Sequence, residues 1–229
     1  MKNKLLSFLL LTMFILCIAS CGRDKTKADT TGDNFSSGEA GNKLPENLSI
    51  PEEGLLDRDY ENLLSGKYNI EIEVEDYGTI ALTLDADTAP VTVTNFIDLI
   101  NDGFYNGLTF HRIIDGFMIQ GGDPEGNGYG GSGRNIQGEF AANGIENNIA
   151  HTRGVISMAR SKPADSASSQ FFIMHEDAPH LDGDYAAFGE VTSGMEVVDA
   201  ICKNTKVEDR NGTTLPANQP KIVEIRIVE

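Results

Sequence analysis

Arg112 is the most chemically capable side chain in the patterned part of this 229-residue sequence. It stands in the run Phe110-His111-Arg112-Ile113-Ile114. If this run is a strand, Arg112 shares its face with Phe110 and Ile114. His111 and Ile113 then point to the opposite side. A guanidinium stays charged at ordinary pH and can donate hydrogen bonds to an atom that gains electron density during a reaction, so the run predicts a cationic donor on one face of a sheet.

In two further segments an amide side chain and large apolar side chains occur at every second position. Met118 and Gln120 would share one face of a strand. In the second segment, Gln170, Phe172 and Met174 would share another face. A polar residue beside large apolar residues on one face is what a peptide-binding groove needs.

Other reaction classes lack the residue spacing that they require. The glycine-rich stretch 121–133 does not end in the Gly-Lys-Ser/Thr of a phosphate-binding loop. Cys202 falls on the apolar side of a helical pattern, so we expect a buried thiol that behaves as a small hydrophobe. We expect no metal site and no cofactor, because the histidines do not fall at tight metal-ligand spacings: His111, His151, His175 and His180.

The charge balance is strongly acidic. The chain holds 18 Lys and Arg against 35 Asp and Glu, a formal net charge of −17. Such a surface repels phosphate backbones, and no basic cluster offsets it. We therefore expect no nucleic-acid partner.

Alternating patterns at both ends of the patterned region predict strands. Apolar and acidic residues alternate over 70–75, and a second alternation over 80–84 follows the turn Asp76-Tyr77-Gly78, so the two segments should form a hairpin. Val223, Ile225 and Ile227 alternate with polar residues and predict a final strand.

Two helices are predicted between these strands. Pro90 suits a first helical position, and an apolar stripe at helical spacing follows it. The segment 193–196 has capping-box spacing, with Met195, Val198 and Cys202 on one face of the helix that it would begin. Many short strands with two helices, in about 160 residues, indicate a mainly β fold: a closed antiparallel β-barrel with helices covering its ends.

The N-terminus has the order of a lipoprotein signal. Lys2 and Lys4 precede a short apolar run, and small residues then lead to Cys21. We expect residues 1–20 to be a signal peptide and Cys21 to carry long acyl chains such as palmitate, because several chains on one cysteine make a lasting membrane anchor. Residues 21–65 then form a flexible tether, and residues 66–229 form the folded domain. An ordinary secretory signal with an incidental cysteine is the alternative. The packing of residues 48–65 stays open.

Three blocks of sequence resemble cyclophilins. The first runs from Phe110 to Asp123, the second combines 157–160 with 168–173, and the third runs from Leu181 to Gly189. The blocks follow in the family's order, and the resemblance spans residues 68–229. It implies a closed eight-stranded antiparallel barrel capped by two helices, with a substrate groove on its outer wall. By the same resemblance, the glycine-rich stretch 121–133 is a loop near this groove.

The resemblance also implies site residues. Arg112, Gln120 and Phe117 would be catalytic. The substrate would be bound by Met118, Ala159, Arg160, Gln170, Phe172, His180, Leu181 and Tyr185. His180, Arg160 and Tyr185 stand where relatives often have tryptophan, asparagine and histidine, which puts the family's drug binding and peptide preference in doubt here.

The activity that the resemblance implies is peptidyl-prolyl cis/trans isomerisation. It would assist folding of proline-containing polypeptides in the bacterial cell envelope, from a monomer anchored to a membrane outside the cytoplasm. The reaction changes no covalent bond, so it needs no metal and no nucleophile. A non-catalytic module or holdase that binds proline peptides is the alternative, and the intact Arg112 argues against it. A structural lipoprotein with an occluded groove is a third possibility.

Overall fold

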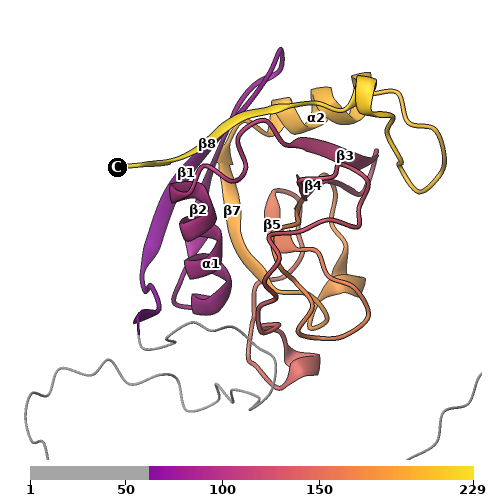
Figure 1. The fold of residues 1–229 in the computed structure, drawn as a ribbon. Helices are drawn as coiled ribbons and strands as arrows, with labels where there is room; N and C mark the ends of the chain where they lie inside the picture. The colour runs from indigo at the N-terminus through magenta and orange to yellow at the C-terminus, as the bar shows by residue number, and fades with distance from the viewer. Residues whose placement is uncertain (1–61) are drawn as a thin grey trace, which may run out of the picture. The chain divides into compact units, whose positions relative to one another are not determined.

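A computed structural model describes residues 62–229 (Figure 1). The predicted signal peptide, Cys21 and almost all of the predicted tether lie outside these residues. Leu63 and Leu64 lie inside them and pack, partly buried, against the core. The Leu64 N–H donates to Thr94 Oγ1 at 2.9 Å. The last residues before the first strand are therefore part of the folded unit.

Among residues 62–229 the first strand begins at Lys67, and these residues contain eight strands, two α-helices and short 3₁₀ helices. In chain order the strands and helices are β1 (Lys67–Val74), β2 (Gly78–Asp85), α1 (Pro90–Asn101), β3 (Thr109–Ile114), β4 (Met118–Asp123), β5 (Val155–Met158), β6 (Phe171–Met174), β7 (Ala187–Ser193), α2 (Met195–Asn204) and β8 (Ile222–Val228). Neither helix of this part of the chain has the length and apolar character needed to span a bilayer.

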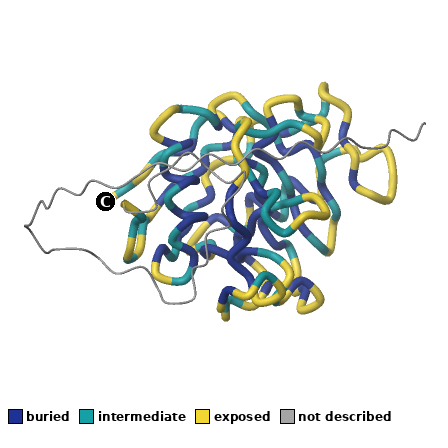
Figure 2. The backbone as a smooth tube through the Cα atoms, turned by 60° about the horizontal axis from the view of Figure 1, so that its bottom comes forward, coloured by how far each residue is buried: buried dark blue, intermediate teal, exposed yellow. Residues whose placement is uncertain are grey.

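The predicted hairpin is confirmed as β1 and β2, which pair from Lys67 with Asp85 to Val74 with Gly78. Its turn requires left-handed backbone at Asp76, where φ is 63°. Asn and Asp tolerate this conformation better than other side chains do. The inward-facing residues of both strands are fully buried, as Figure 2 shows for the centre of the molecule.

All eight strands belong to one sheet in the order β3-β4-β6-β5-β7-β2-β1-β8. The pairs are antiparallel. The end strands β3 and β8 do not pair along their length, and a single bridge joins Thr109 to Lys221. The prediction of a closed barrel is therefore wrong, and the sheet is an open half-barrel that curves around the core (Figure 1).

The barrel stays open because another segment occupies the outer edge of β3. The Ile113 N–H donates to Gly212 O at 2.8 Å, and the Thr214 N–H donates to His111 O at 3.1 Å. These bonds satisfy backbone groups of β3 that a neighbouring strand would otherwise pair with. The loop between α2 and β8 thus takes the place of the β3–β8 pairing that would close the barrel.

The two predicted helices are present, and they contact different parts of the sheet. Helix α1 contacts β2 and β8, while α2 contacts β2, β3 and β4. Pro90 is the first residue of α1, as predicted, and the apolar stripe is buried. The predicted capping box of α2 is wrong, because the N-cap is Gly194 in left-handed backbone at φ 92° and no side chain caps the helix. Val198 and Cys202 of α2 are buried in the core, as predicted.

A bulge in β3 makes one prediction about side-chain orientation wrong. Phe110 is opposite Gly121 while Arg112 is opposite Gln120, so β3 accommodates one extra residue, His111. Phe110 is fully buried in the core, whereas Arg112 is half-buried. The expectation that these two share a face is wrong, because a bulge shifts the alternation of side chains by one residue.

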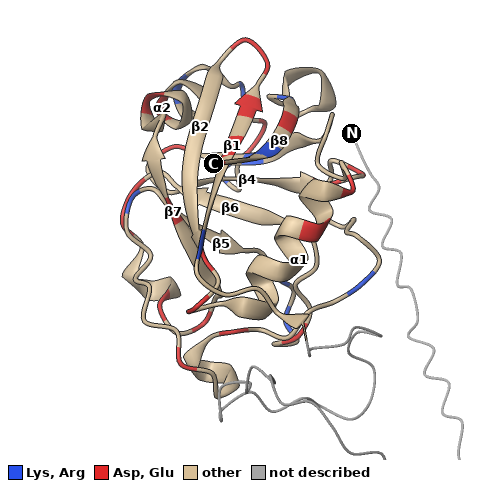
Figure 3. Ribbon diagram, turned by 90° about the vertical axis from the view of Figure 1, so that its left-hand side faces the viewer, with Lys and Arg blue, Asp and Glu red and all other residues tan. Residues whose placement is uncertain are grey.

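The predicted C-terminal strand is confirmed as β8, but its buried face differs. Of the three residues in the predicted apolar pattern, only Ile225 is buried, while Val223 and Ile227 are exposed. A register shift in the pairing of β1 and β8 places Ile222 in the core instead. Acidic side chains gather on this part of the sheet (Figure 3), where Arg226 pairs with Glu71 and Glu73 of β1 and with Glu224.

Candidate active site

A groove of about 480 Å³ crosses the surface beside β3, β4 and β6. All the residues predicted for the site line it except Gln170 and His180. Its lining comprises His111, Arg112, Phe117, Met118, Gln120, Gly126, Asn127, Gly128, Tyr129, Ala159, Arg160, Phe172, Leu181, Tyr185, Asn211, Thr213 and Thr214. The fold thus brings together side chains from segments that are far apart in the sequence.

One end of the groove is apolar. Met118, Phe172 and Leu181 belong to a small buried cluster that is separate from the main core, and Phe117 and Tyr185 pack against it. The rings of Phe172 and Tyr185 meet edge to face at 5.9 Å between centroids. This end is shaped to hold a compact apolar ring or side chain.

The polar side of the groove is a chain of oriented hydrogen bonds. Arg112 donates from Nε to Asn211 O at 2.8 Å and from Nη1 to Gln120 Oε1 at 3.1 Å. Gln120 Nε2 donates to Gln170 Oε1 at 2.9 Å, and Gln170 Nε2 donates to Gly130 O at 2.8 Å. Within residues 62–229, Arg112 Nη2 has no acceptor, so it can donate to a ligand in the groove.

Arg112 remains a cation in this setting. Burial lowers its pKa, and the negative charge of Asp209 offsets part of that effect. Because an unperturbed arginine loses its proton only far above neutral pH, the guanidinium stays charged at pH 7. A partly desolvated charge acts more strongly on a nearby ligand than the same charge in water.

Gln170 and His180 lie beside the groove rather than in it. Gln170 lines an adjoining hollow, whose walls include Gln120 and Tyr129. His180 is exposed and stacks on Phe117, with 5.7 Å between the ring centroids. Both residues thus contact a wall of the groove.

Arg160 lines the groove, but its guanidinium is held by the protein. Nε and Nη2 both donate to Asp184 O, at 2.9 and 2.8 Å. The guanidinium also lies 4.9 Å from the ring centroid of Phe140 and 4.8 Å from that of Tyr185. With these contacts, Arg160 supports the groove wall at Tyr185 and can also contact a ligand.

A Ser-His-Asp arrangement lies directly behind the apolar end. His151 Nδ1 is 3.0 Å from Asp182 Oδ1, and Nε2 is 3.0 Å from Ser157 Oγ. The His151 ring stacks on Phe172. Ser157 is completely buried, so it cannot attack a substrate, and burial lowers the pKa of His151 despite Asp182. The group supports Phe172 and is not a nucleophilic centre.

The glycine-rich loop after Asp123 borders the groove, as the resemblance implied, but its individual lining residues were not predicted. The residues after Asp123 form a tight loop, because Asp123 accepts the N–H groups of Glu125, Asn127 and Gly128. These bonds hold the pKa of Asp123 below its ordinary value although burial opposes them. The loop places the fully exposed ring of Tyr129 at the groove's rim. In the sequence, an Asp followed shortly by Gly and Asn is typical of such a turn.

His111 also faces the groove, contrary to its predicted orientation. It is buried, and among residues 62–229 neither ring nitrogen has a hydrogen-bond partner. Burial lowers its pKa, and Asp123 offsets this only in part, so the ring is neutral at pH 7. This orientation of His111 depends on the bulge in β3, which the sequence pattern alone does not indicate.

Within the described part of the chain, Asp115, His175 and Cys202 are near enough to one another to hold a metal ion, and they lie outside the groove.

Residues 69–227 match the protein family described as cyclophilin type peptidyl-prolyl cis-trans isomerase. The chain is 47% identical to a peptidyl-prolyl cis-trans isomerase of Helicobacter pylori strain 26695, over 57% of this chain and 78% of the relative. It is 49% identical to peptidyl-prolyl cis-trans isomerase B of Bacillus subtilis, over 54% of this chain and 82% of the relative.

Solved structures with a similar fold agree with these relatives. A cyclophilin type peptidyl-prolyl cis-trans isomerase of Cryptosporidium parvum has a TM-score of 0.63 at 31% identity, covering 72% of this chain and 99% of the other. A crystal structure of the same protein in the presence of the dipeptide Ala-Pro has a TM-score of 0.61 at 32% identity, covering 70% and 99%.

Proposed function

The chain belongs to the family of cyclophilin-type peptidyl-prolyl cis-trans isomerases and is an enzyme of that activity, and from this premise we propose that the groove beside Arg112 is its active site and that its substrates are proline-containing polypeptides outside the cytoplasm. The observation that carries the proposal is the oriented guanidinium of Arg112 beside an apolar pocket.

Rotation about an X–Pro bond crosses a barrier of about 18–20 kcal/mol, because it breaks amide resonance. In the twisted transition state the proline nitrogen regains a lone pair. Arg112 donates a hydrogen bond to that lone pair. The planar amide nitrogen is a poor acceptor, so the donor stabilises the transition state more than the ground state.

The apolar end of the groove holds the proline ring while the rest of the peptide rotates. Phe172, Met118 and Leu181 surround the ring, and Phe117 closes the side next to His180. The related Cryptosporidium parvum structure was determined in the presence of the dipeptide Ala-Pro, which supports a proline-containing peptide as the ligand.

The polar edge of the groove holds the peptide backbone around the proline. Gln120 and Gln170 offer amide groups in a fixed orientation. The Ala159 N–H is already bonded to Gln170 O at 2.9 Å, so Ala159 contacts the peptide through its carbonyl. None of these groups has to gain or lose a proton during the reaction.

A bulky side chain in the groove tests this assignment. Ala159→Trp should fill the groove and lower kcat/KM for a proline tetrapeptide at least tenfold in a protease-coupled assay. Ala142→Trp is the matched control, because Ala142 is exposed and lines neither the groove nor the adjoining hollow. Equal activity of the two variants, with both shown to be folded by thermal unfolding, would place the active site elsewhere.

We further propose that the enzyme is a monomer of the bacterial cell envelope, anchored to a membrane through acyl chains on Cys21. The support is the basic, apolar and small-residue order of residues 1–21. Cys21→Ala should move the protein from the membrane fraction to a soluble or uncleaved form. A Cys21→Ala protein that is fully cleaved and still sediments with membranes would refute the anchor.

A further inference from the structure

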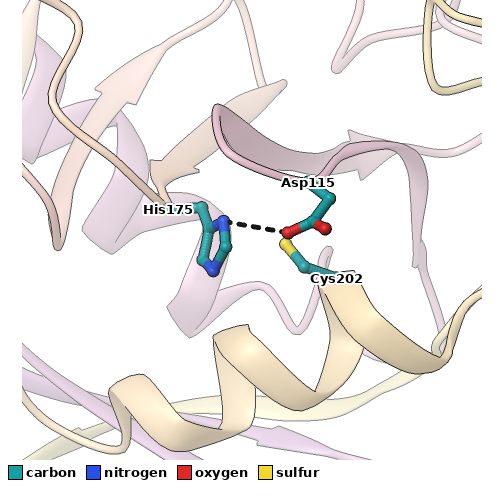
Figure 4. Close-up of side chains that lie close together, drawn as sticks. All are labelled: Asp115, His175 and Cys202. Atoms are coloured by element: carbon teal, nitrogen blue, oxygen red, sulfur yellow. Dashed lines mark ion pairs between the residues drawn. The ribbon is translucent and has the colours of Figure 1, made fainter.

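Three side chains that the isomerase groove does not use meet near the surface. Asp115 comes from the turn between β3 and β4, His175 follows β6, and Cys202 lies on α2 (Figure 4). One ligand atom of each lies within 4.8 Å of the other two. Asp115 Oδ1 is 3.5 Å from His175 Nδ1. Because they come from separate segments, spacing along the chain gives no sign of them.

The orientation of His175 is fixed from its far side. Its Nε2 lies 3.1 Å from Asp199 Oδ1, which in turn pairs with Arg153 Nη2 at 2.7 Å. Nε2 therefore carries the ring hydrogen, and Nδ1, which lies 3.5 Å from Asp115 Oδ1, keeps its lone pair. A histidine that binds a metal ion almost always donates its other N–H to such a carboxylate.

At present the Nδ1 lone pair accepts a hydrogen bond from the Gly116 N–H at 2.9 Å. This bond agrees with a ring hydrogen on Nε2 and an unprotonated Nδ1. A metal ion would replace it, and the Gly116 N–H lies at an exposed turn, where water can take over as its acceptor.

The residues around Cys202 carry negative charge that a bound cation would balance. The thiol is buried, while the side chain of Asp115 is 75% exposed and opens the cluster to solvent. Burial, together with Asp115 and Asp199, raises the pKa of Cys202 to about 12. A bound cation reverses this effect by displacing the thiol proton and pairing with the thiolate.

We propose that Asp115, His175 and Cys202 form a binding site for Zn²⁺, with Asp199 holding His175 in place and a solvent molecule as the fourth ligand. Sulfur, imidazole nitrogen and carboxylate oxygen are the donors that Zn²⁺ takes in proteins, at about 2.0–2.3 Å. The 3.5 Å between Asp115 and His175 already suits two ligands of one tetrahedral ion. Cys202 Sγ lies within 4.8 Å of both ligand atoms and would have to move closer to join them.

The site also adjoins the groove through the backbone. The His175 N–H donates to Phe117 O at 2.8 Å, and Asp115 stands two residues before Phe117. A Zn²⁺ ion would therefore tie the turn before Phe117 to β6 and α2. Binding should raise the thermal unfolding midpoint, which does not depend on isomerase activity.

The test is a Zn²⁺ titration against a chromophoric chelator. It uses the full chain with Cys17→Ser and Cys21→Ser, so that Cys202 is the sole thiol. We expect one Zn²⁺ per chain, and at least tenfold weaker binding in each of Cys202→Ser, His175→Gln and Asp115→Asn. Asp199→Asn should weaken binding about tenfold. With Co²⁺ as the probe, a thiolate-to-metal charge-transfer band should appear and should be absent in Cys202→Ser.

Glu176→Gln and His180→Gln are the matched controls, because both residues are exposed and outside the cluster, Glu176 next to His175 in the chain and His180 against Phe117. They should bind Zn²⁺ as the parent protein does. If Cys202→Ser does not fold, Asp115→Asn decides the question, since that side chain is mostly in solvent. The proposal is overturned if the parent protein binds Zn²⁺ no better than Asp115→Asn, if the controls lose binding equally, or if the Co²⁺ spectrum lacks the thiolate band.

Discussion

Arg112 is oriented by protein acceptors on two sides, Asn211 O and Gln120 Oε1. This arrangement leaves a donor directed at the groove without reorganisation when a peptide binds. A preorganised donor is worth more than a mobile one, because its orientation does not have to be fixed during the reaction. In the proposed mechanism, Gln120 therefore supports catalysis by positioning Arg112 as well as by contacting substrate.

Glu139 is a buried carboxyl whose titration should be visible in protein stability. It accepts the N–H groups of Val91 and Thr92 at the start of α1. Burial nevertheless raises its pKa to about 7, because these bonds offset only part of the desolvation. The folded protein thus binds a proton between pH 4.5 and 7 that the unfolded chain releases. This stabilisation is complete below pH 4.5 and is lost as the pH rises through 7.

Glu139→Gln should remove that pH dependence. The free energy of unfolding of the parent protein should fall by on the order of 3 kcal/mol from Glu139 between pH 4.5 and 8. Urea unfolding across this range should show a flatter profile for Glu139→Gln, whatever its absolute stability. Glu146→Gln, at an exposed position, should keep the parent slope. Identical slopes for the parent and Glu139→Gln would contradict the assignment.

At the level of elements, the loop before β8 links the sheet edge to the site. Gly212 has φ 80°, and a Cβ there would lie 2.2 Å from Ile113 O. The neighbouring Asn211 O accepts the Arg112 Nε–H. A side chain at position 212 must therefore push the loop away from β3 and remove an acceptor from Arg112.

Gly212→Ala should lower the free energy of unfolding by about 2–4 kcal/mol and kcat/KM about tenfold. Gly144→Ala is the matched control: its φ is 79°, but nothing lies within 4 Å of the added Cβ. The control should cost only the backbone strain, about 1–2 kcal/mol, and leave kcat/KM unchanged. Urea unfolding and the isomerase assay measure the two effects. Equal effects of the two substitutions would show that the contact with β3 is unimportant.

Helices and strands were predicted from the sequence more accurately than the bulges and the pairing at the sheet edge. Hydrophobic alternation found the β1–β2 hairpin, and helical spacing found α1, because local patterns determine both. The bulge at His111 and the loop that replaces strand pairing along β3 depend on contacts between distant segments. The groove residues were largely predicted through the resemblance to cyclophilins, while strand alternation indicated only that Met118 and Gln120 share a face. Asn211 and Tyr129 were missed because they reach the groove from loops.

At the scale of the whole molecule, the folded unit begins slightly before the predicted domain boundary. A shortened chain that starts at Asn62 should keep the full stability and isomerase activity, since the groove residues all lie beyond position 110. A chain that starts at Ser65 loses the contacts of Leu63 and Leu64 and should lose about 1–3 kcal/mol of stability. Its activity when folded should be unchanged.

Urea unfolding and the isomerase assay on both shortened chains check this prediction. Lower activity in the folded chain that starts at Asn62 would mean that residues before 62 contribute to catalysis. Equal stability of the two chains would mean that Leu63 and Leu64 add nothing to the fold.

The most direct test of the account is the effect of Arg112→Ala on catalysis compared with its effect on peptide binding. If the guanidinium acts on the twisted amide alone, kcat/KM should fall by the equivalent of about 2–4 kcal/mol, while the affinity for a proline peptide changes much less. Arg112→Lys should be nearly as damaging, because an ammonium on a flexible stem does not reproduce the planar fork of donors. An Arg112→Ala enzyme that turns over at the parent rate, or one whose entire loss lies in peptide affinity, would contradict the account.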